Sequence, residues 1–210
     1  MVMAMRLARG CAAPLGVTLV LAFVLSYLSL SYLPEFMALA LVAVFTALTV
    51  LAFWFFRDPP RRVGMGIVSP ADGKICLVQR SGKKQKVSIF MNVNNVHVNR
   101  APITGRVERT LHKPGAHVPA FRKDSSRNER FHTLIKSEKG TVHVVQIAGW
   151  LARRIVSYTS PGQTIRRGQR MGMIRFGSRV DVILPGNAAI KVVPGQRVWA
   201  GETTLAVWRG

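Results

Sequence analysis

A glycine–serine pair near the C-terminal end, Gly177-Ser178, could carry chemistry on the peptide bond that joins its own two residues. The pair lies between two apolar runs of the sequence. In such a place a Gly-Ser peptide can be a bond that the protein breaks on itself, which turns the serine into a pyruvoyl group. It can equally be an ordinary turn, and the remaining residues must decide between these interpretations.

Two further residues have neighbours that suggest chemistry. Asp72 is the only acidic residue between Pro59 and Val107. Asp-Gly after proline is a good turn sequence, but an aspartate can shape a turn and also hold the ring nitrogen of a histidine. His97 lies in a stretch of asparagines that interrupts an apolar strand. A histidine in a strand is more often structural, but a strand facing only core would not carry such polar neighbours.

The composition bounds the partners of the chain. Its 210 residues include 30 Lys and Arg against 9 Asp and Glu, a net charge of +21. This excess predicts an anionic partner, either a nucleic acid or an acidic membrane surface. The two cysteines have no metal-binding or redox spacing, and the sequence has no His-x-His or His-Glu-x-x-His motif. We therefore expect no metal site.

The N-terminal region favours the membrane. Residues 15–33 and 36–56 are two apolar runs without charge, each about long enough to cross a ~30 Å hydrocarbon core. A cleaved signal peptide would not be followed so closely by a second run. Basic residues flank the pair on its outer sides, which predicts that both ends are cytoplasmic. These residues are Arg6, Arg9, Arg57, Arg61 and Arg62. We expect a membrane hairpin over residues 1–58, with residues 59–210 on the cytoplasmic side of a prokaryotic cell membrane.

The region after the hairpin has the pattern of a mainly β domain. Short runs rich in Val and Ile alternate with Gly, Pro and Asn, and no long amphipathic helix is evident. The expected strands include 67–75, 87–93, 141–147, 171–174 and 180–184. A motif at residues 161–169 recurs at 194–202, which predicts two similar hairpin turns. Such paired turns resemble those of barrel-sandwich domains of the lipoyl and biotinyl type. The lysine motif of those carriers is missing, so the repeat indicates architecture.

Taken together, these segments resemble the phosphatidylserine decarboxylases in their short prokaryotic form. The resemblance covers about residues 59–185, and its pieces occur in the order of the family. In chain order they are Ser69-Pro70-Ala71-Asp72-Gly73, Val96-His97-Val98-Asn99-Arg100-Ala101-Pro102, Pro114-Gly115 with Asn128-Glu129-Arg130, Val145-Gln146-Ile147-Ala148-Gly149, and Phe176-Gly177-Ser178. Two positions depart from the family pattern. Arg179 stands where many members have threonine, and Arg100 stands where longer members have a second histidine.

The resemblance implies an enzyme, a carboxy-lyase made as a proenzyme. It implies that Asp72 orients His97, and that His97 is the general base for the Ser178 hydroxyl. Cleavage between Gly177 and Ser178 would give chains 1–177 and 178–210, which stay together as a heterodimer. Ser178 would become a covalent pyruvoyl group that forms a Schiff base with phosphatidylserine. The products would be phosphatidylethanolamine and CO2, with no metal involved, and the partners would be this substrate and anionic membrane lipid.

Two other interpretations remain at this stage. A non-enzymatic membrane-anchored adaptor with a lipoyl-like domain would explain the repeat and the hairpin. It would leave Asp72, His97 and Gly177-Ser178 without a role. A basic nucleic-acid-binding barrel at the membrane is allowed by the charge. Its aromatic residues, however, do not alternate with the basic residues as a stacking surface would require, so we expect no nucleic-acid partner.

Overall fold

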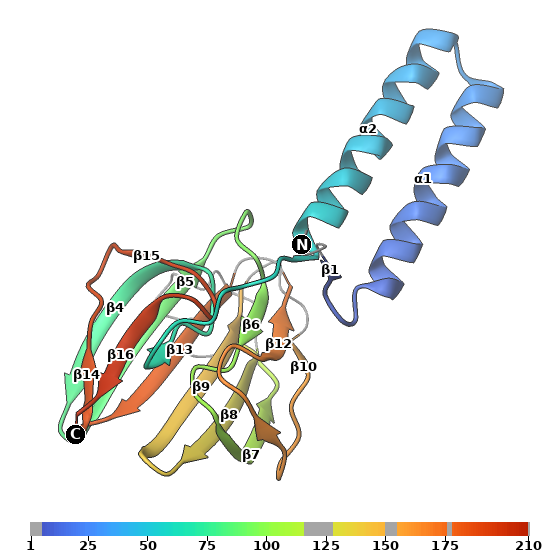
Figure 1. The fold of residues 1–210 in the computed structure, drawn as a ribbon. Coiled ribbons are helices and arrows are strands. Elements are labelled where there is room, and N and C mark those ends of the chain that lie inside the picture. The colour runs from blue at the N-terminus through green and yellow to red at the C-terminus, as the bar shows by residue number, and fades with distance from the viewer. Residues whose placement is uncertain (1–5, 116–127, 150–154, 176–177, 210) are drawn as a thin grey trace. The chain divides into compact units, whose positions relative to one another are not determined.

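The structure is a computed structural model that describes residues 6–115, 128–149, 155–175 and 178–209. The chain divides into two compact units, Met1–Pro60 and Arg61–Gly210. The first unit is helical and the second is built from strands (Figure 1).

The first unit is a pair of long apolar helices. The helices are α1, Ala12–Tyr32, and α2, Glu35–Phe55, each 21 residues long. At 1.5 Å per residue each measures about 31 Å, the thickness of a hydrocarbon core. Pro34 separates them, because the residue before a proline avoids the helical conformation and Leu33 is extended there. Both helices are long and apolar enough to cross a membrane by length and composition.

The ends of the helical pair meet in a short sheet. Strand β1, Arg6–Leu7, pairs antiparallel with β2, Arg57–Asp58. The two helices run side by side in opposite directions (Figure 1). Their outward surfaces carry large apolar side chains all round, such as Phe23 at 75 % exposure. A helix without a polar face in this position is suited to an apolar surrounding.

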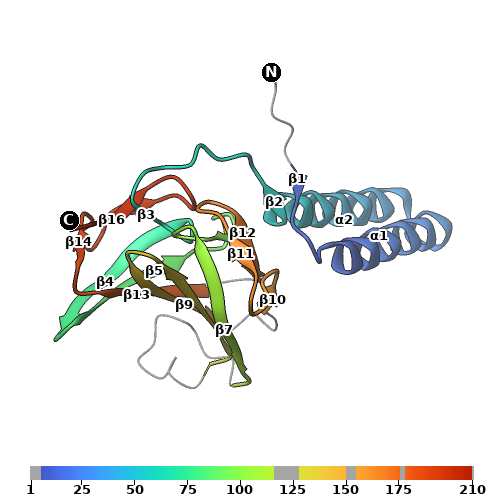
Figure 2. The same ribbon diagram turned by 60° about the horizontal axis from the view of Figure 1, so that its bottom comes forward.

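The second unit is organised around a curled antiparallel sheet of eight strands (Figures 1 and 2). In spatial order the strands are β11 (Thr164–Ile165), β7 (Gly105–Lys113), β8 (Arg130–Ser137), β9 (Gly140–Ala148), β13 (Ser178–Pro185), β5 (Lys84–Met91), β4 (Gly73–Ser81) and β15 (Arg197–Val198). The described residues of this unit also form two three-stranded sheets. One sheet consists of β10 (Ile155–Ser157), β12 (Arg170–Ile174) and β6 (Val98–Arg100), in that order. The other consists of β14 (Ala188–Ile190), β16 (Thr204–Trp208) and β3 (Ile67–Val68).

Strand β13 shows how the core is built. Val180, Val182 and Leu184 alternate along it and are at most 1 % exposed, while Arg179 and Ile183 point the other way. The face of the large sheet that carries these three side chains is called the inner face below. Residues opposite one another on antiparallel strands share a face, so Ile89 and Val87 of β5 lie beside them. The prediction of a mainly β fold after two apolar helices is confirmed.

Several strands differ from their predicted bounds. The run 67–75 is two strands, β3 and β4, because Pro70–Asp72 form a bend before Gly73. Gly73 has φ of +156°, and a Cβ atom there would lie 2.1 Å from the carbonyl oxygen of Phe90. Strand β5 ends at Met91, two residues early, where Asn92 and Asn95 close a turn. Strands β7 and β8 were not predicted, because charged residues outnumber the apolar ones on their outer face.

The 33-residue repeat forms two matching hairpins. Gly162 and Gly195 have φ of +84° and +90°, a region that L side chains rarely adopt. Strand β11 then pairs with the beginning of β7, and β15 pairs with the beginning of β4. The amide of Gly162 donates to Val107 O at 2.7 Å, and that of Gly195 donates to Ile75 O at 2.8 Å. The architectural interpretation of the repeat is confirmed.

Candidate active site

Ser178 is the first residue of β13, the strand at the centre of the large sheet. It is paired on one side with Met91 of β5 and on the other with Ala148 of β9. Its side chain lies on the inner face, and the residue is 0 % exposed. Gly177, the other half of the predicted cleavage site, lies outside the described residues. On its serine side, therefore, the pair belongs to a buried strand and not to an exposed turn.

The hydroxyl of Ser178 begins a chain of buried polar contacts. Its Oγ donates to Met91 Sδ at 3.2 Å, and Asn99 Nδ2 donates to the same sulfur at 3.7 Å. Asn99 Oδ1 accepts a hydrogen bond of 2.7 Å from Gln146 Nε2. All four residues are 0 % exposed. Because a thioether is a weak acceptor, the serine hydroxyl is held in place without a strong competitor for its proton.

Sequence reasoning gave no role to Asn99 or Gln146, although a signal was present. In β9 the inward-facing positions are 142, 144, 146 and 148, and Gln146 is the only polar residue among them. A polar residue at an inward-facing position of a strand needs an explanation, because burial of an amide costs free energy unless the amide is hydrogen-bonded. Asn99 stands in the stretch that drew attention to His97, but its partner could not be read from the sequence.

His97 lies just before β6 and is 1 % exposed. Its Nδ1 is 2.9 Å from Asn95 O, and its own carbonyl oxygen accepts the amide of Ile174 at 3.2 Å. With the Nδ1 proton directed at a carbonyl, the lone pair lies on Nε2, which is the form that a base requires. Ile174 ends β12, four residues before Ser178, so the histidine segment lies against the chain that leads to the serine.

The other histidines in the described part of the chain are engaged elsewhere. His112 Nε2 lies 2.9 Å from Glu129 Oε1. The rings of His132 and His143 stack, with Nδ1 of the first 3.0 Å from Nε2 of the second. Burial, followed by the charges of His132 and Lys84, lowers the pKa of His143 to about 4. This pair lies on the opposite face of β8 and β9 from Gln146, away from Ser178.

Asp72 is 5 % exposed and is held by three partners. Its Oδ2 lies 2.7 Å from Arg61 Nη2, and its Oδ1 accepts the amide of Ala200 at 2.7 Å. Burial raises the pKa of this carboxyl, and the Ala200 amide, the Arg61 charge and the amide of Val96 oppose the rise. Val96 immediately precedes His97. The carboxylate therefore reaches the histidine segment through the main chain.

A second internal repeat explains why only one carboxylate oxygen of Asp72 is needed to close its turn. The segment Ser69–Gly73 (Ser-Pro-Ala-Asp-Gly) matches Ala101–Gly105 (Ala-Pro-Ile-Thr-Gly). The two segments make the same contacts in the two halves of the domain. Asp72 Oδ1 accepts the amide of Ala200, and Thr104 Oγ1 accepts the amide of Arg167 at 3.0 Å. Closing this turn therefore requires only one oxygen, and the second oxygen of Asp72 is free to bind Arg61.

The two departures from the family pattern have structural contacts. Arg179 Nε lies 3.0 Å from Asp181 Oδ1, on the face of β13 opposite to Ser178. Arg100 is 7 % exposed, and its Nη1 donates to Gly168 O at 3.1 Å. Both of these contacts are made to groups other than Ser178, Met91, Asn99 and Gln146.

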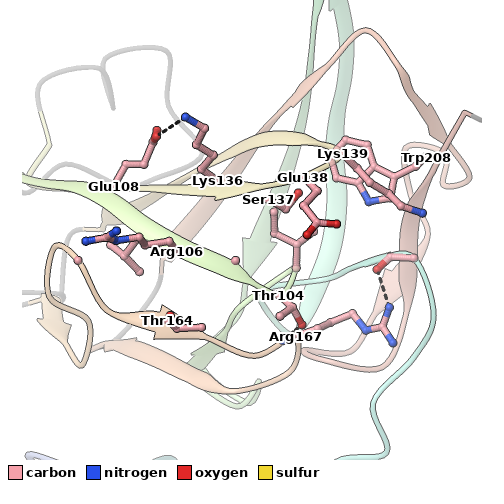
Figure 3. Close-up of a pocket in the computed structure, with 15 residues that line it drawn as sticks. Thr104, Arg106, Glu108, Lys136, Ser137, Glu138, Lys139, Thr164, Arg167 and Trp208 are labelled. Carbon is pink, nitrogen blue, oxygen red and sulfur yellow. Dashed lines mark hydrogen bonds and ion pairs between the residues drawn. The ribbon is translucent and has the colours of Figure 1, made fainter.

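A large hollow of about 1220 Å³ lies at the other end of the sheet (Figure 3). Its lining includes the turn between β8 and β9, together with Thr104, Arg167 and Trp208. From this turn to Ala148, β9 extends over nine residues, or eight steps of about 3.4 Å, which is about 27 Å. The hollow is therefore separate from the site around Ser178.

Comparisons with known proteins identify the family of the chain. The family model described as phosphatidylserine decarboxylase matches residues 48–206. A protein of Methanococcoides burtonii, named as an archaetidylserine decarboxylase proenzyme, is 52 % identical over 162 residues, or 76 % of each chain. A phosphatidylserine decarboxylase proenzyme of Thermobifida fusca is 49 % identical, over 79 % of this chain and 77 % of its own length. A proenzyme of the same name from Streptomyces coelicolor is 46 % identical, over 76 % of this chain and 74 % of its own length.

The fold and the matches together define the class of protein. A buried serine at the head of a central strand, in a β domain after two apolar helices, occurs here in a chain whose relatives are decarboxylase proenzymes. The chain belongs to the phosphatidylserine decarboxylase family and is an enzyme, a carboxy-lyase.

Proposed function

We propose that this enzyme cuts itself between Gly177 and Ser178 and then decarboxylates phosphatidylserine to phosphatidylethanolamine at residue 178. The observation that carries the proposal is the complete burial of Ser178 at the head of a strand paired on both sides. A serine with only a turn to form would be exposed, whereas a nucleophile gains from being fixed beside its target. Proenzyme relatives support the cut, because their names imply processing.

The chain itself supplies the groups for the cut. His97 Nε2 takes the proton of Ser178 Oγ as the oxygen bonds to the carbonyl carbon of Gly177, and it returns the proton to the peptide nitrogen, which leaves that carbon as an amine. Glycine, which has no Cβ, permits the close approach. Loss of the Cα proton of residue 178 then forms a Cα=Cβ double bond as the serine Cβ–O bond breaks, so Gly177 keeps both oxygens as a carboxylate and residue 178 becomes dehydroalanine. Residue 178 loses its hydroxyl oxygen, and water then releases its nitrogen as ammonia.

The residues around position 178 fit the pyruvoyl group that this sequence of bonds would leave. The group is part of the chain, so no separate binding site is needed. Met91 and Ala148 lie opposite residue 178 on the two neighbouring strands, and Asn99 contacts the sulfur of Met91. A pyruvoyl carbonyl, when present, accepts the electrons that remain as a carboxylate leaves as CO2. His97 is the proposed donor of the proton that replaces the CO2.

The strand pairing explains how the two products would stay together. The fragment 178–210 contains β13, β15 and β16. Strand β13 lies between β5 and β9, β15 pairs with β4, and β16 pairs with β3. Every one of these partner strands belongs to residues 1–177. Loss of one peptide bond would therefore leave a heterodimer held by the sheets and by a shared core.

The helical pair and the charge fit a lipid substrate. We propose that α1 and α2 cross the cell membrane and that both ends lie on the cytoplasmic side, where the short sheet β1–β2 joins them. The net charge of +21 favours the anionic surface of that leaflet. A diacyl substrate then has no need to leave the bilayer.

The activity can be measured directly on lipid vesicles. We expect the purified full-length protein to release CO2 from vesicles that contain phosphatidylserine labelled at the serine carboxyl, with phosphatidylethanolamine as the lipid product. Free serine should release far less, because it lacks the diacyl anchor that holds the substrate at the membrane. Release from free serine alone, or no release from phosphatidylserine by a protein that has been cut, would contradict the proposal.

The role of Asp72 can be separated from its turn by Asp72→Thr. Threonine should close the turn as Thr104 does in the matching segment, so we expect unfolding free energy to fall by only about 1–2 kcal/mol. The charge that reaches the histidine segment would be lost, so self-cleavage should slow about tenfold or more. Denaturant unfolding measures the first effect, and a gel time course measures the second.

The control for this experiment is Thr104→Ala. It removes the equivalent turn bond in the other half of the domain and should leave the rate of the cut unchanged. If Asp72→Thr matured as fast as the parent chain, Asp72 would be a turn residue with no part in the chemistry.

A further inference from the structure

Gln146 lies beside residue 178 on the inner face of the large sheet. In β9 it is two residues before Ala148, which is directly opposite Ser178. Gln146 itself is opposite Val180, so it is the diagonal neighbour of Ser178 on the same face. It also ends the chain of contacts that runs from the serine through Met91 and Asn99.

The amide of Gln146 uses only one of its two ends. Its Nε2 donates to Asn99 Oδ1 at 2.7 Å, whereas its Oε1 accepts no hydrogen bond from any described residue, although Gln146 is 0 % exposed. The orientation follows from Asn99, which directs its NH2 group at Met91 Sδ and so presents an oxygen to Gln146. A buried acceptor without a donor is costly, so one that persists needs an explanation.

The packing around this amide keeps room for it. Gly172 of β12 faces Gln146, and a Cβ atom there would lie 2.9 Å from Nε2 and 3.3 Å from Oε1. An apolar side chain at position 146 would fill the same space without an unpaired oxygen. The amide is therefore retained for a bond that the described residues of the uncut chain do not make.

The chemistry of the substrate indicates the missing donor. In a serine head group the phosphate and the carboxylate only accept hydrogen bonds at neutral pH, and the amino group is the one donor. The same amino group must come to residue 178, which is adjacent to Gln146. After the cut, residue 178 would be the first residue of its own chain, at the head of β13.

We propose that Gln146 Oε1 accepts a hydrogen bond from the amino group of the lipid substrate and so positions that nitrogen at residue 178. This inference rests on the proposed function. Gln146 transfers no proton and forms no covalent bond. It selects a head group with an N–H donor and holds the donor beside the carbon that it must reach.

The test compares variants that keep or remove the acceptor. Gln146→Met preserves the volume without an acceptor, and Gln146→Glu preserves an acceptor without the NH2 group. Gln85→Met is the matched control, because Gln85 is also buried but bonds to Pro185 O and Ala188 O at the far end of β13. Each full-length protein is examined first for self-cleavage on a gel. It is then incubated with phosphatidylserine and cyanoborohydride, and the lipid trapped on the 178–210 fragment is measured by intact mass.

We expect Gln146→Met to mature within about threefold of the parent rate but to trap lipid about tenfold or more slowly, the scale of a lost hydrogen bond to a charged group. Its KM should rise more than its kcat falls. At saturating phosphatidylserine, Gln146→Glu and Gln85→Met should trap at close to the parent rate. Trapping by Gln146→Met at the parent rate overturns the proposal. Equal losses in the Met and Glu variants also overturn it, because they would assign Gln146 a purely structural bond to Asn99.

Two further outcomes are decided by the same proteins. If Gln146→Met does not mature, the KM of Gln146→Glu for phosphatidylserine tests the inference instead. A carboxylate at position 146 should bind the ammonium group of the substrate more tightly than the amide does, and so lower this KM. An unchanged or raised KM would then overturn the inference. Failure of the parent chain to be cut or to trap lipid would refute the proposed function itself, independently of Gln146.

Discussion

Ser178→Ala protein should remain a single full-length chain and release no measurable CO2 from phosphatidylserine. Alanine cannot attack the Gly177 carbonyl, so the bond should be cut more slowly by on the order of 10⁴-fold or more, the scale of a lost nucleophile. The parent protein should give two chains, 1–177 and 178–210, on a denaturing gel and by intact mass. The smaller chain should be blocked to Edman sequencing, because residue 178 would no longer carry an amino group.

The matched control for this variant is Ser88→Ala. Ser88 is 2 % exposed in β5, and its Oγ has no hydrogen-bond partner among the described residues. Ser88 is therefore a buried serine of the same large sheet, but it does not follow the bond that is proposed to be cut. Ser88→Ala should mature and turn over normally. A parent chain that stayed intact through maturation, with an unmodified serine at position 178, would refute the self-cleavage mechanism.

The second large effect is expected for His97→Ala, which should slow self-cleavage by about 10²–10⁴-fold. The reason lies in the arrangement of the ring, whose Nδ1 is directed at Asn95 O so that Nε2 carries the lone pair. A gel time course of the cut measures the effect. Added imidazole should restore part of the rate, since removal of the ring leaves a space of the same shape.

His132→Ala is the control, because its ring contacts His143 on the opposite face of the sheet. This variant should be cut at the parent rate. If His97→Ala matured and turned over normally, the base would have to be another group and the assignment of His97 would be wrong. If both variants were cut slowly, the loss would reflect folding, which a thermal unfolding curve would reveal.

Features that depend on neighbouring residues could be predicted from the sequence. The two helices follow from apolar runs of the right length, and Pro34 alone fixes the break between them. The hairpins after Pro161 and Pro194 follow from glycines that permit positive φ. The sequence also indicated Ser178, His97 and Asp72 as candidates, because each is unusual among its immediate neighbours.

Features that depend on pairing between distant strands could not be predicted. Strand β13 could be recognised as a strand, but its place between β5 and β9 is set by the packing of the whole sheet. That place brings Gln146 next to residue 178, and it brings Asn99 to both Gln146 and Met91. Gln146 is 32 positions from Ser178 and 47 from Asn99, and Met91 is 87 from Ser178, and no local pattern encodes such contacts.

Asp72 illustrates the division between the two kinds of information. The sequence by itself determined that an isolated carboxylate stands in a turn before a strand, because proline and glycine fix the local backbone. Only the tertiary structure decided which groups that carboxylate contacts. It places one oxygen on the Ala200 amide and the other on Arg61, and it brings the Val96 amide close by. The physical reason is that turns are set by the torsion angles of a few adjacent residues. The partners of a buried charge are set by how separate segments of the chain pack together.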